Sequence, residues 1–86
     1  MPRLSAFYGI VIAMYHNDHE PPHFHARYGG EQAQVSLDTL AILNGSLPPR
    51  ALRLVQQWAR MHRAELDTAW QRARAGLNLD AIEPLP

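Results

Sequence analysis

The sequence contains no cysteine and no lysine, and its formal net charge at pH 7 is zero. Without cysteine the chain can form neither disulfide bonds nor thiolate metal sites, and it has no thiol nucleophile. Neutral charge disfavours a general nucleic-acid binder and a binder of acidic membranes, because both normally carry a basic excess. All eight basic side chains are arginine, which we attribute to genomic base composition.

Long hydrophobic runs are also absent. The longest run, from Ile10 to Met14, is far shorter than a membrane-spanning helix, and the first residues lack the pattern of a signal peptide. We therefore expect a cytoplasmic protein without membrane association. Residues 1–86 are expected to form a single small domain, since 47% hydrophobic and 19% charged residues are ordinary for a folded chain.

The segment from Phe7 to Tyr15 has the composition of one buried strand. It is rich in β-branched and aromatic residues, and apolar side chains occur at both odd- and even-numbered positions. That pattern favours a central strand that is covered on both faces. Gly9 is expected to mark a bulge in this strand or a close approach of another backbone.

A β-hairpin is predicted from His23 to Leu37, with Gly29-Gly30 as its two-residue turn. When Tyr28 is placed opposite Glu31, the facing pairs separate into an apolar set and a polar set. Paired residues share a face of the sheet, so the hairpin has one apolar face and one polar face. The apolar pairs are Ala26–Ala33, Phe24–Val35 and Pro22–Leu37, and the polar pairs are Arg27–Gln32, His25–Gln34 and His23–Ser36.

The second half of the sequence reads as helix. Ser46 is a candidate N-cap before two prolines, residues 41–43 allow a short strand, and Asn44-Gly45 allows a turn. No glycine or proline occurs from Arg50 to Ala75, and a straight helix of that length would measure about 39 Å. We expect either a bend near His62 or packing of the second half on another chain.

The end of the helix and the tail complete the predicted fold. Gly76 has the position of a residue that terminates a helix, and Ile82 to Leu85 allow an edge strand. The predicted class is α+β: a three- to four-stranded, mostly antiparallel sheet with a β-hairpin, packed on one long or bent C-terminal helix. The polar face of the hairpin, with His23, His25 and Arg27, is expected to stay open.

Four of the five histidines lie within ten residues, from His16 to His25. Two imidazoles at alternate positions of a strand share a face and can bind one ion, and imidazole is a common ligand of zinc, copper and nickel. The metal ligands proposed from the sequence are His19, His23 and His25, with His16, Asp18 or Glu20 as a further ligand. A zinc ion held by three protein ligands keeps an open position, and there it generates hydroxide at neutral pH.

The same residues have other interpretations. The histidines can bond backbone groups of the proline turn without any ion, or act as metal-free acid–base groups or as contacts for an anion. Asn17 and Asp18 either orient a histidine or only form the turn. His62 is either a core histidine or approaches the cluster from the helix. The candidate catalytic residues are His19, His23, His25, Arg27 and Asp18.

Several motifs are shared with one known family, and the densest of them runs from Asn17 to Tyr28. They are Met1-Pro2-x-Leu4-Ser5-x-Phe7-Tyr8-Gly9-Ile10, Met14-Tyr15-x-Asn17-Asp18-His19-x-Pro21-Pro22-His23-Phe24-His25-x-Arg27-Tyr28, Leu47-Pro48-Pro49-Arg50-Ala51, Trp58-Ala59-x-x-His62-x-x-Glu65-Leu66 and Ile82-x-Pro84-Leu85. With them the chain resembles the bacterial domain-of-unknown-function family numbered 4160. The family carries no established activity. The resemblance implies a shared site at Asn17, Asp18, His19, His23, His25 and Arg27, with His62 also matching.

Two functions follow as hypotheses. Genes of the family often lie beside another small gene, an arrangement that resembles a toxin–antitoxin pair. The first hypothesis is therefore an interaction module that contacts the product of a neighbouring gene or forms a homo-oligomer. The alternative is a metal-dependent or histidine-based hydrolase or nuclease that uses His19, His23 and His25, with a divalent ion such as zinc.

Overall fold

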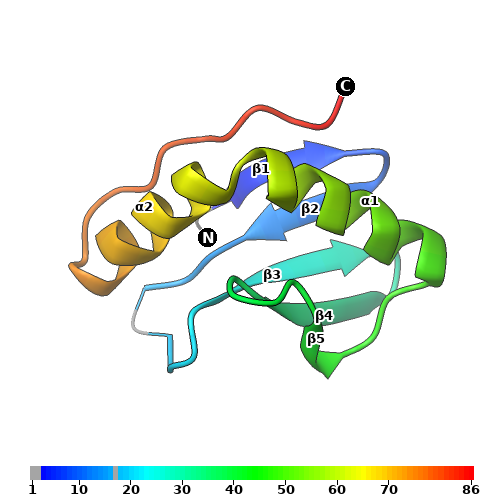
Figure 1. Cartoon of the computed structure of the whole chain (residues 1–86), viewed down its shortest axis with the longest axis horizontal. Coiled ribbons are helices and arrows are strands. Elements are labelled where there is room, and N and C mark those ends of the chain that lie inside the picture. Colours follow the sequence, from blue (N-terminus) through cyan, green and yellow to red (C-terminus); the bar gives the residue numbers. More distant parts are fainter. Residues whose placement is uncertain (1–2, 17) are drawn as a thin grey trace.

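The computed structural model describes residues 3–16 and 18–86, which form one antiparallel sheet with two helices packed on one of its faces (Figure 1). The strands lie in the order β1-β2-β3-β4-β5, so each strand pairs with its neighbour in the sequence. The predicted α+β class is confirmed, but the sheet has five strands and the helical region two helices. The elements are β1 Arg3–Phe7, β2 Ile10–Ala13, β3 His23–Tyr28, β4 Glu31–Ser36, β5 Ile42–Gly45, α1 Pro49–Met61 and α2 Arg63–Arg74.

The segment predicted as one strand contains a tight turn. Phe7 of β1 faces Ile10 of β2, and Tyr8-Gly9 join the two strands. Both turn residues have positive φ, 51° at Tyr8 and 80° at Gly9, as a type I′ hairpin turn requires. The prediction of one continuous strand was therefore wrong, and Gly9 belongs to a turn rather than to a bulge or a close backbone approach within that strand. Such turns normally contain Asn-Gly, and a tyrosine at the first position conceals the turn in the sequence.

The predicted register of the second hairpin is confirmed at all six pairs between β3 and β4. It continues one step further, because the Leu37 N–H donates to the Pro22 carbonyl at 3.0 Å. Phe24 and Ala26 are fully buried on the face that the helices cover, whereas Arg27 on the opposite face is exposed. β3 therefore contributes to the core with one set of side chains and to a polar face with the other.

The start of α1 differs from the predicted start. The Ser46 hydroxyl donates to the Glu31 carboxylate at 3.1 Å instead of capping the helix. α1 begins at Pro49, with Pro48 as its N-cap and no side-chain cap. Proline is tolerated there because the first N–H groups of a helix have no partner within the helix.

The helical region bends at His62, which was one of the two predicted alternatives. The backbone at His62 has φ −123° and ψ 28°, which ends α1 and allows α2 to begin at Arg63. α2 packs on its own chain rather than on another one. The residues that it buries are Leu66, Ala69, Trp70 and Ala73.

The C-terminal tail lies along β1, at the edge of the sheet opposite β5 (Figure 1). Gly76 has φ 74°, and the chain leaves α2 there through the two backbone bonds of a Schellman motif. The Ile82 N–H then donates to the Leu4 carbonyl at 2.7 Å. The tail is therefore not the edge strand that the sequence allowed, but it docks at the β1 edge of the sheet and covers part of it.

Trp58 lies at the centre of the core. Its ring centroid is 5.5 Å from that of Phe7 and 6.0 Å from that of Phe24. Its indole N–H donates to the carbonyl of Glu83 at 2.8 Å, so α1, two strands and the tail all contact this residue. Neither helix is long and apolar enough to cross a lipid bilayer.

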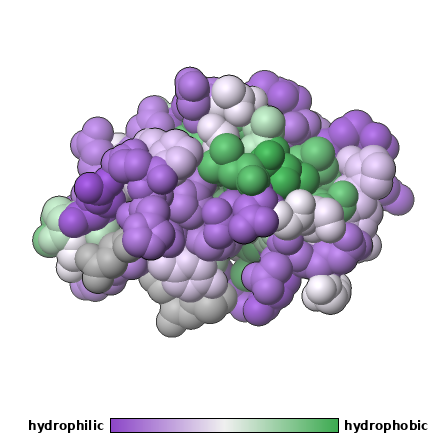
Figure 2. All heavy atoms as spheres, turned by 90° about the horizontal axis from the view of Figure 1, so that it is seen from below, coloured by the Kyte–Doolittle hydropathy of each residue, from purple (hydrophilic) through white to green (hydrophobic). Residues whose placement is uncertain are grey.

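Some apolar surface remains exposed. Figure 2 shows one hydrophobic patch on an otherwise largely hydrophilic face, on the side of the molecule where β4 and β5 lie. Leu43 of β5 is 46% exposed, and the turn residue Tyr8 is 60% exposed. The surplus apolar surface expected on a long straight helix is not present, because α2 buries it against its own chain.

Gly45 ends β5 in a conformation and an environment that exclude any side chain. Its φ is 81°, and a Cβ there would lie 2.2 Å from the Gln32 carbonyl oxygen. We predict that Gly45→Ala lowers the free energy of unfolding by about 2–3 kcal/mol, because the strand must shift or the strained backbone must adapt. Urea denaturation measures this change.

The control is Gly30→Ala, since Gly30 has no atom within 4 Å of an added Cβ. It should leave the free energy of unfolding within about 0.5 kcal/mol of the parent or raise it slightly. Equal losses in the two variants would contradict the role assigned to Gly45.

Candidate metal centre

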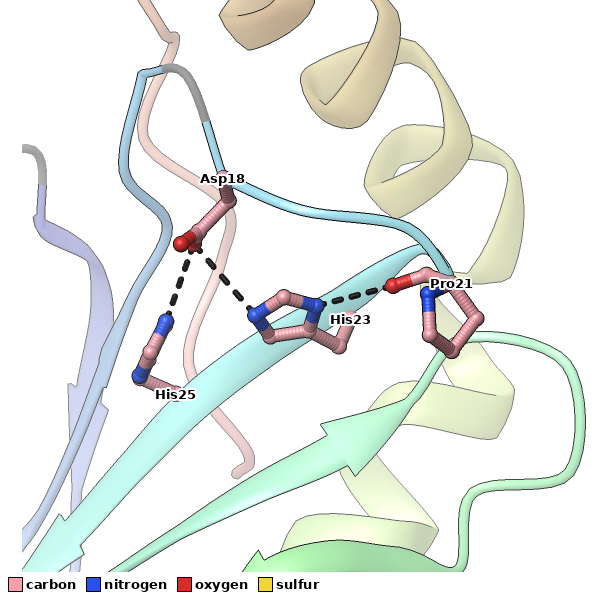
Figure 3. A network of polar contacts seen from close by, with 4 residues as sticks. All are labelled: Asp18, Pro21, His23 and His25. Carbon is pink, nitrogen blue, oxygen red and sulfur yellow. Dashed lines mark hydrogen bonds and ion pairs between the residues drawn. The ribbon is translucent and has the colours of Figure 1, made fainter.

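Three side chains converge where the loop before β3 meets the first residues of that strand (Figure 3). Asp18 comes from the loop, and His23 and His25 come from β3. One Asp18 carboxylate oxygen, Oδ2, lies 3.0 Å from His25 Nε2 and 3.4 Å from His23 Nε2. The three ligand atoms all lie within 4.8 Å of one another. We call this group of three side chains the metal centre, as the candidate site for an ion.

The protonation of His23 follows from its neighbours. Its Nδ1 lies 2.8 Å from the Pro21 carbonyl oxygen, which can only accept a hydrogen bond, so Nδ1 carries a proton. In the neutral ring Nε2 then has a lone pair, and this lone pair faces the Asp18 carboxylate (Figure 3). Nε2 is buried and has no hydrogen-bond partner among the described residues. Two facing acceptors repel each other, so either a proton or a metal ion has to lie between them.

Aromatic rings hold both imidazoles in place. The Trp70 ring of α2 lies 5.5 Å from the His23 ring, and His23 is only 4% exposed. Tyr15 packs edge-on against His25 with ring centroids 4.5 Å apart. The His25 side chain stays 20% exposed and that of Asp18 21%. The metal centre is therefore closed on the His23 side and accessible to solvent beside His25 and Asp18.

The distances suit a common ion. Two ligands that each lie about 2.0–2.1 Å from zinc at a tetrahedral angle are separated by about 3.4 Å. The separations of 3.0 and 3.4 Å from Asp18 Oδ2 are close to that value. A histidine ligand normally donates its other ring N–H to a carbonyl or carboxylate, as His23 does to Pro21. Two imidazoles and one carboxylate form a known donor set for catalytic zinc.

The structure places the other predicted ligands elsewhere. His16 Nε2 lies 3.0 Å from the Leu77 carbonyl oxygen, and His19 is exposed and outside the metal centre. Glu20 forms an ion pair with Arg74 of α2. Asn17, predicted either to orient a histidine or only to form the turn, lies outside the described residues.

His62 stays with the core and the helix bend. Its ring lies 5.6 Å from Trp58, and Nδ1 is 2.6 Å from the Glu65 carboxylate. The polar partner of this core histidine is therefore a carboxylate of its own helical region. Among the described residues, the group that can reach one ion consists of Asp18, His23 and His25. His62 is therefore not part of the metal centre.

The polar hairpin face is only partly open. Arg27 and His25 face solvent as predicted, but Trp70 covers His23. The prediction of a fully open face was wrong because it ignored α2, which reaches the end of β3 only after the bend at His62.

The family of the chain is decided by comparison. Residues 9–71 match the family model described as Domain of unknown function (DUF4160). The chain is a member of the DUF4160 family. The DUF4160 match includes the whole metal centre and most of α2, and it ends before the tail. No curated protein and no solved structure matches the chain.

Sequence reasoning missed two residues that contact and orient the metal centre of this DUF4160 protein. Pro21 acts through its backbone carbonyl, so its residue type gives no sign of the role. Trp70 lies 47 positions after His23, and its contact with that ring depends on the bend between α1 and α2. An aromatic residue on the apolar side of a helix was the available signal, but it is equally typical of a core residue.

We predict that zinc raises the melting temperature of the parent protein and of His19→Gln, but not that of His23→Gln. A ligand at 100 times its dissociation constant stabilises a fold by about 2.7 kcal/mol, or roughly 10 °C or more for a domain of this size. Thermal unfolding with and without zinc measures the response, which is independent of any loss of basal stability. An equal response of His19→Gln and His23→Gln would contradict the assignment of ligands.

Proposed function

We propose that this protein binds a divalent transition-metal ion, with zinc as the reference case, through Asp18, His23 and His25. We further propose that the ion activates water for hydrolysis. The observation that supports this most is the buried Nε2 of His23, which faces a carboxylate and has no hydrogen-bond partner within residues 3–16 and 18–86. An ion at this position would bind the lone pair of His23 Nε2 and the charge of Asp18, and it would replace the 3.0 Å hydrogen bond between His25 Nε2 and Asp18 Oδ2.

The residues of the chain have distinct tasks in this proposal. The Pro21 carbonyl fixes the orientation of the His23 ring, and Trp70 keeps water from that side. Asp18 supplies the negative charge, and the exposed side of His25 leaves a coordination position open for water or substrate. A bound divalent ion lowers the pKa of its water toward neutral pH, which is the chemistry that hydrolysis requires.

Elemental analysis tests the binding directly. Protein purified without a histidine tag should contain close to one equivalent of metal after incubation with zinc and dialysis. The double variant His23→Ala/His25→Ala should contain none, whereas the matched double variant His16→Ala/His19→Ala should retain the parent content. Equal metal content in the two double variants would overturn the proposal.

An interaction module in a toxin–antitoxin-like gene pair is the second candidate function. A hollow of about 550 Å³ lies between the two hairpin turns and the start of α1. Tyr8, 60% exposed, and Tyr28, 40% exposed, line it together with Arg50. Tyrosine and arginine are the residue types that contribute most to protein interfaces. Arg50 is the charged residue among the described lining, which favours a partner with an acidic group beside an apolar one.

Co-expression with the product of the neighbouring gene should yield a stable complex. We predict that Tyr8→Ala/Tyr28→Ala weakens this complex at least tenfold, because truncating an interface anchor costs about 2 kcal/mol or more. Met61→Ala, at a side chain 55% exposed on α1, should leave the affinity unchanged. Titration calorimetry measures the affinity of each variant. If the product of the neighbouring gene does not bind the parent protein, this role is excluded.

A further inference from the structure

The open face of the sheet continues directly from the metal centre. His25 pairs with Gln34 of β4, and Gln34 pairs with Asn44 of β5, so the three side chains form one row on this face. Arg27 and Gln32 form the next row. His25 thus belongs both to the metal centre and to the open face.

Two hollows on this face share His25. One has a volume of about 200 Å³, and a smaller one lies toward β2. The larger hollow is below the 300–1,000 Å³ typical of drug-sized ligands, so it suits a small molecule. Its lining is Gln32, Ala33, Gln34, Asn44, Gly45 and His25, and that of the smaller hollow is Val11, Ala13, Tyr15, His25, Ala26, Arg27 and Gln32.

Four polar side chains around the hollows are available to bind a ligand. Within residues 3–16 and 18–86, the side chains of Arg27, Gln32, Gln34 and Asn44 form no hydrogen bond and no ion pair. Other side chains of the same types are engaged: Gln56, for example, donates to the Leu40 carbonyl at 2.9 Å. The arrangement on the open face is therefore not required for the fold.

Charge decides the class of ligand. Neither lining contains a carboxylate among the described residues, whereas Arg27 adds a positive charge. A divalent ion at the metal centre carries more charge than Asp18 neutralises, so ion and guanidinium together attract an anion. A guanidinium binds two oxygens of phosphate side by side, and a second pair of oxygens remains for an ion and an ester group.

We infer that the open face binds small phosphate esters. One phosphate oxygen would bind the ion beside His25 together with its water, Arg27 would bind two others, and the amides of Gln34 and Asn44 would hold the esterified group. His25 and Arg27 lie two positions apart on one face, roughly 7 Å along the strand, which a phosphate and an extended arginine side chain can span. The inference rests on the metal centre of the proposed function.

The corresponding reaction is hydrolysis of the ester. The oxygen of water bonds to phosphorus, and the P–O bond to the ester group breaks. The departing alkoxide takes up the proton that the water loses, so the products are phosphate and an alcohol. No further reactant is needed.

Cobalt-loaded protein provides the test, because the visible spectrum of cobalt responds to a new ligand. Phenyl phosphate should change the spectrum of the parent in a saturable titration. Arg27→Gln should raise its dissociation constant by roughly tenfold, the effect of losing one exposed charge-assisted contact. Arg53→Gln is the matched control, since Arg53 is exposed on α1 and forms no ion pair among the described residues, and it should bind as the parent does.

A second pair of variants tests the position of the ligand. Gln34→Glu places a carboxylate beside His25 and should weaken phenyl phosphate binding, whereas Gln71→Glu on the exposed side of α2 should not. A protein that binds cobalt but shows no spectral response to phenyl phosphate overturns this inference and leaves the metal centre intact. Equal affinity of Arg27→Gln and the parent also overturns it. A protein that binds no cobalt overturns both proposals.

Discussion

The packing of Trp58 on the sheet is the interaction on which the remaining structure depends. Its ring contacts Phe7 of β1 and Phe24 of β3, and its indole N–H donates to the tail at Glu83. The same ring packs on His62, where the helical region bends. A chain of 86 residues buries a smaller fraction of its surface on folding than a larger domain does, so the burial of one large, fully enclosed side chain matters more. α2 begins at this bend, beside the Trp58 ring.

The direction of α2 in turn determines the metal centre. Asp18, His23 and His25 come from one short stretch, but Trp70 of α2 encloses His23, and Arg74 of the same helix forms an ion pair with Glu20 in the loop. Core packing and the candidate site are therefore connected through the bend at His62. A substitution that alters the bend would change the packing of Trp70 on the His23 ring, although none of the proposed ligands is substituted.

Sequence reasoning recovered the parts of the fold in which apolar and polar residues alternate along a strand. The hairpin from His23 to Ser36 could be aligned pair by pair because each residue pair had to be either apolar or polar. The turn at Tyr8-Gly9 could not be recognised, because a tyrosine with positive φ is rare and the strands on both sides of it are apolar. The helix bend was anticipated from length alone, and its direction depends on tertiary contacts.

The candidate site was predictable to a similar degree. His23 and His25 share a face by strand periodicity, and Asp18 was considered as an added ligand. Choosing Asp18 over His16 and His19 requires the course of the loop, which no pattern of residue types fixes. The Pro21 carbonyl and the Trp70 ring act through position rather than chemistry, so they become recognisable only in three dimensions.

The alternation along β3 also has an evolutionary consequence. Phe24 and Ala26 face the helices while His25 and Arg27 face away, so the two sets of side chains can change independently of each other. Substitutions on the outer face can alter the chemistry of that face without disturbing the core. An insertion of one residue within β3 has the opposite effect, because it moves every side chain beyond it to the other face and places imidazole or guanidinium in the core. Related chains should therefore vary here by exchange of residues and keep the length of this strand.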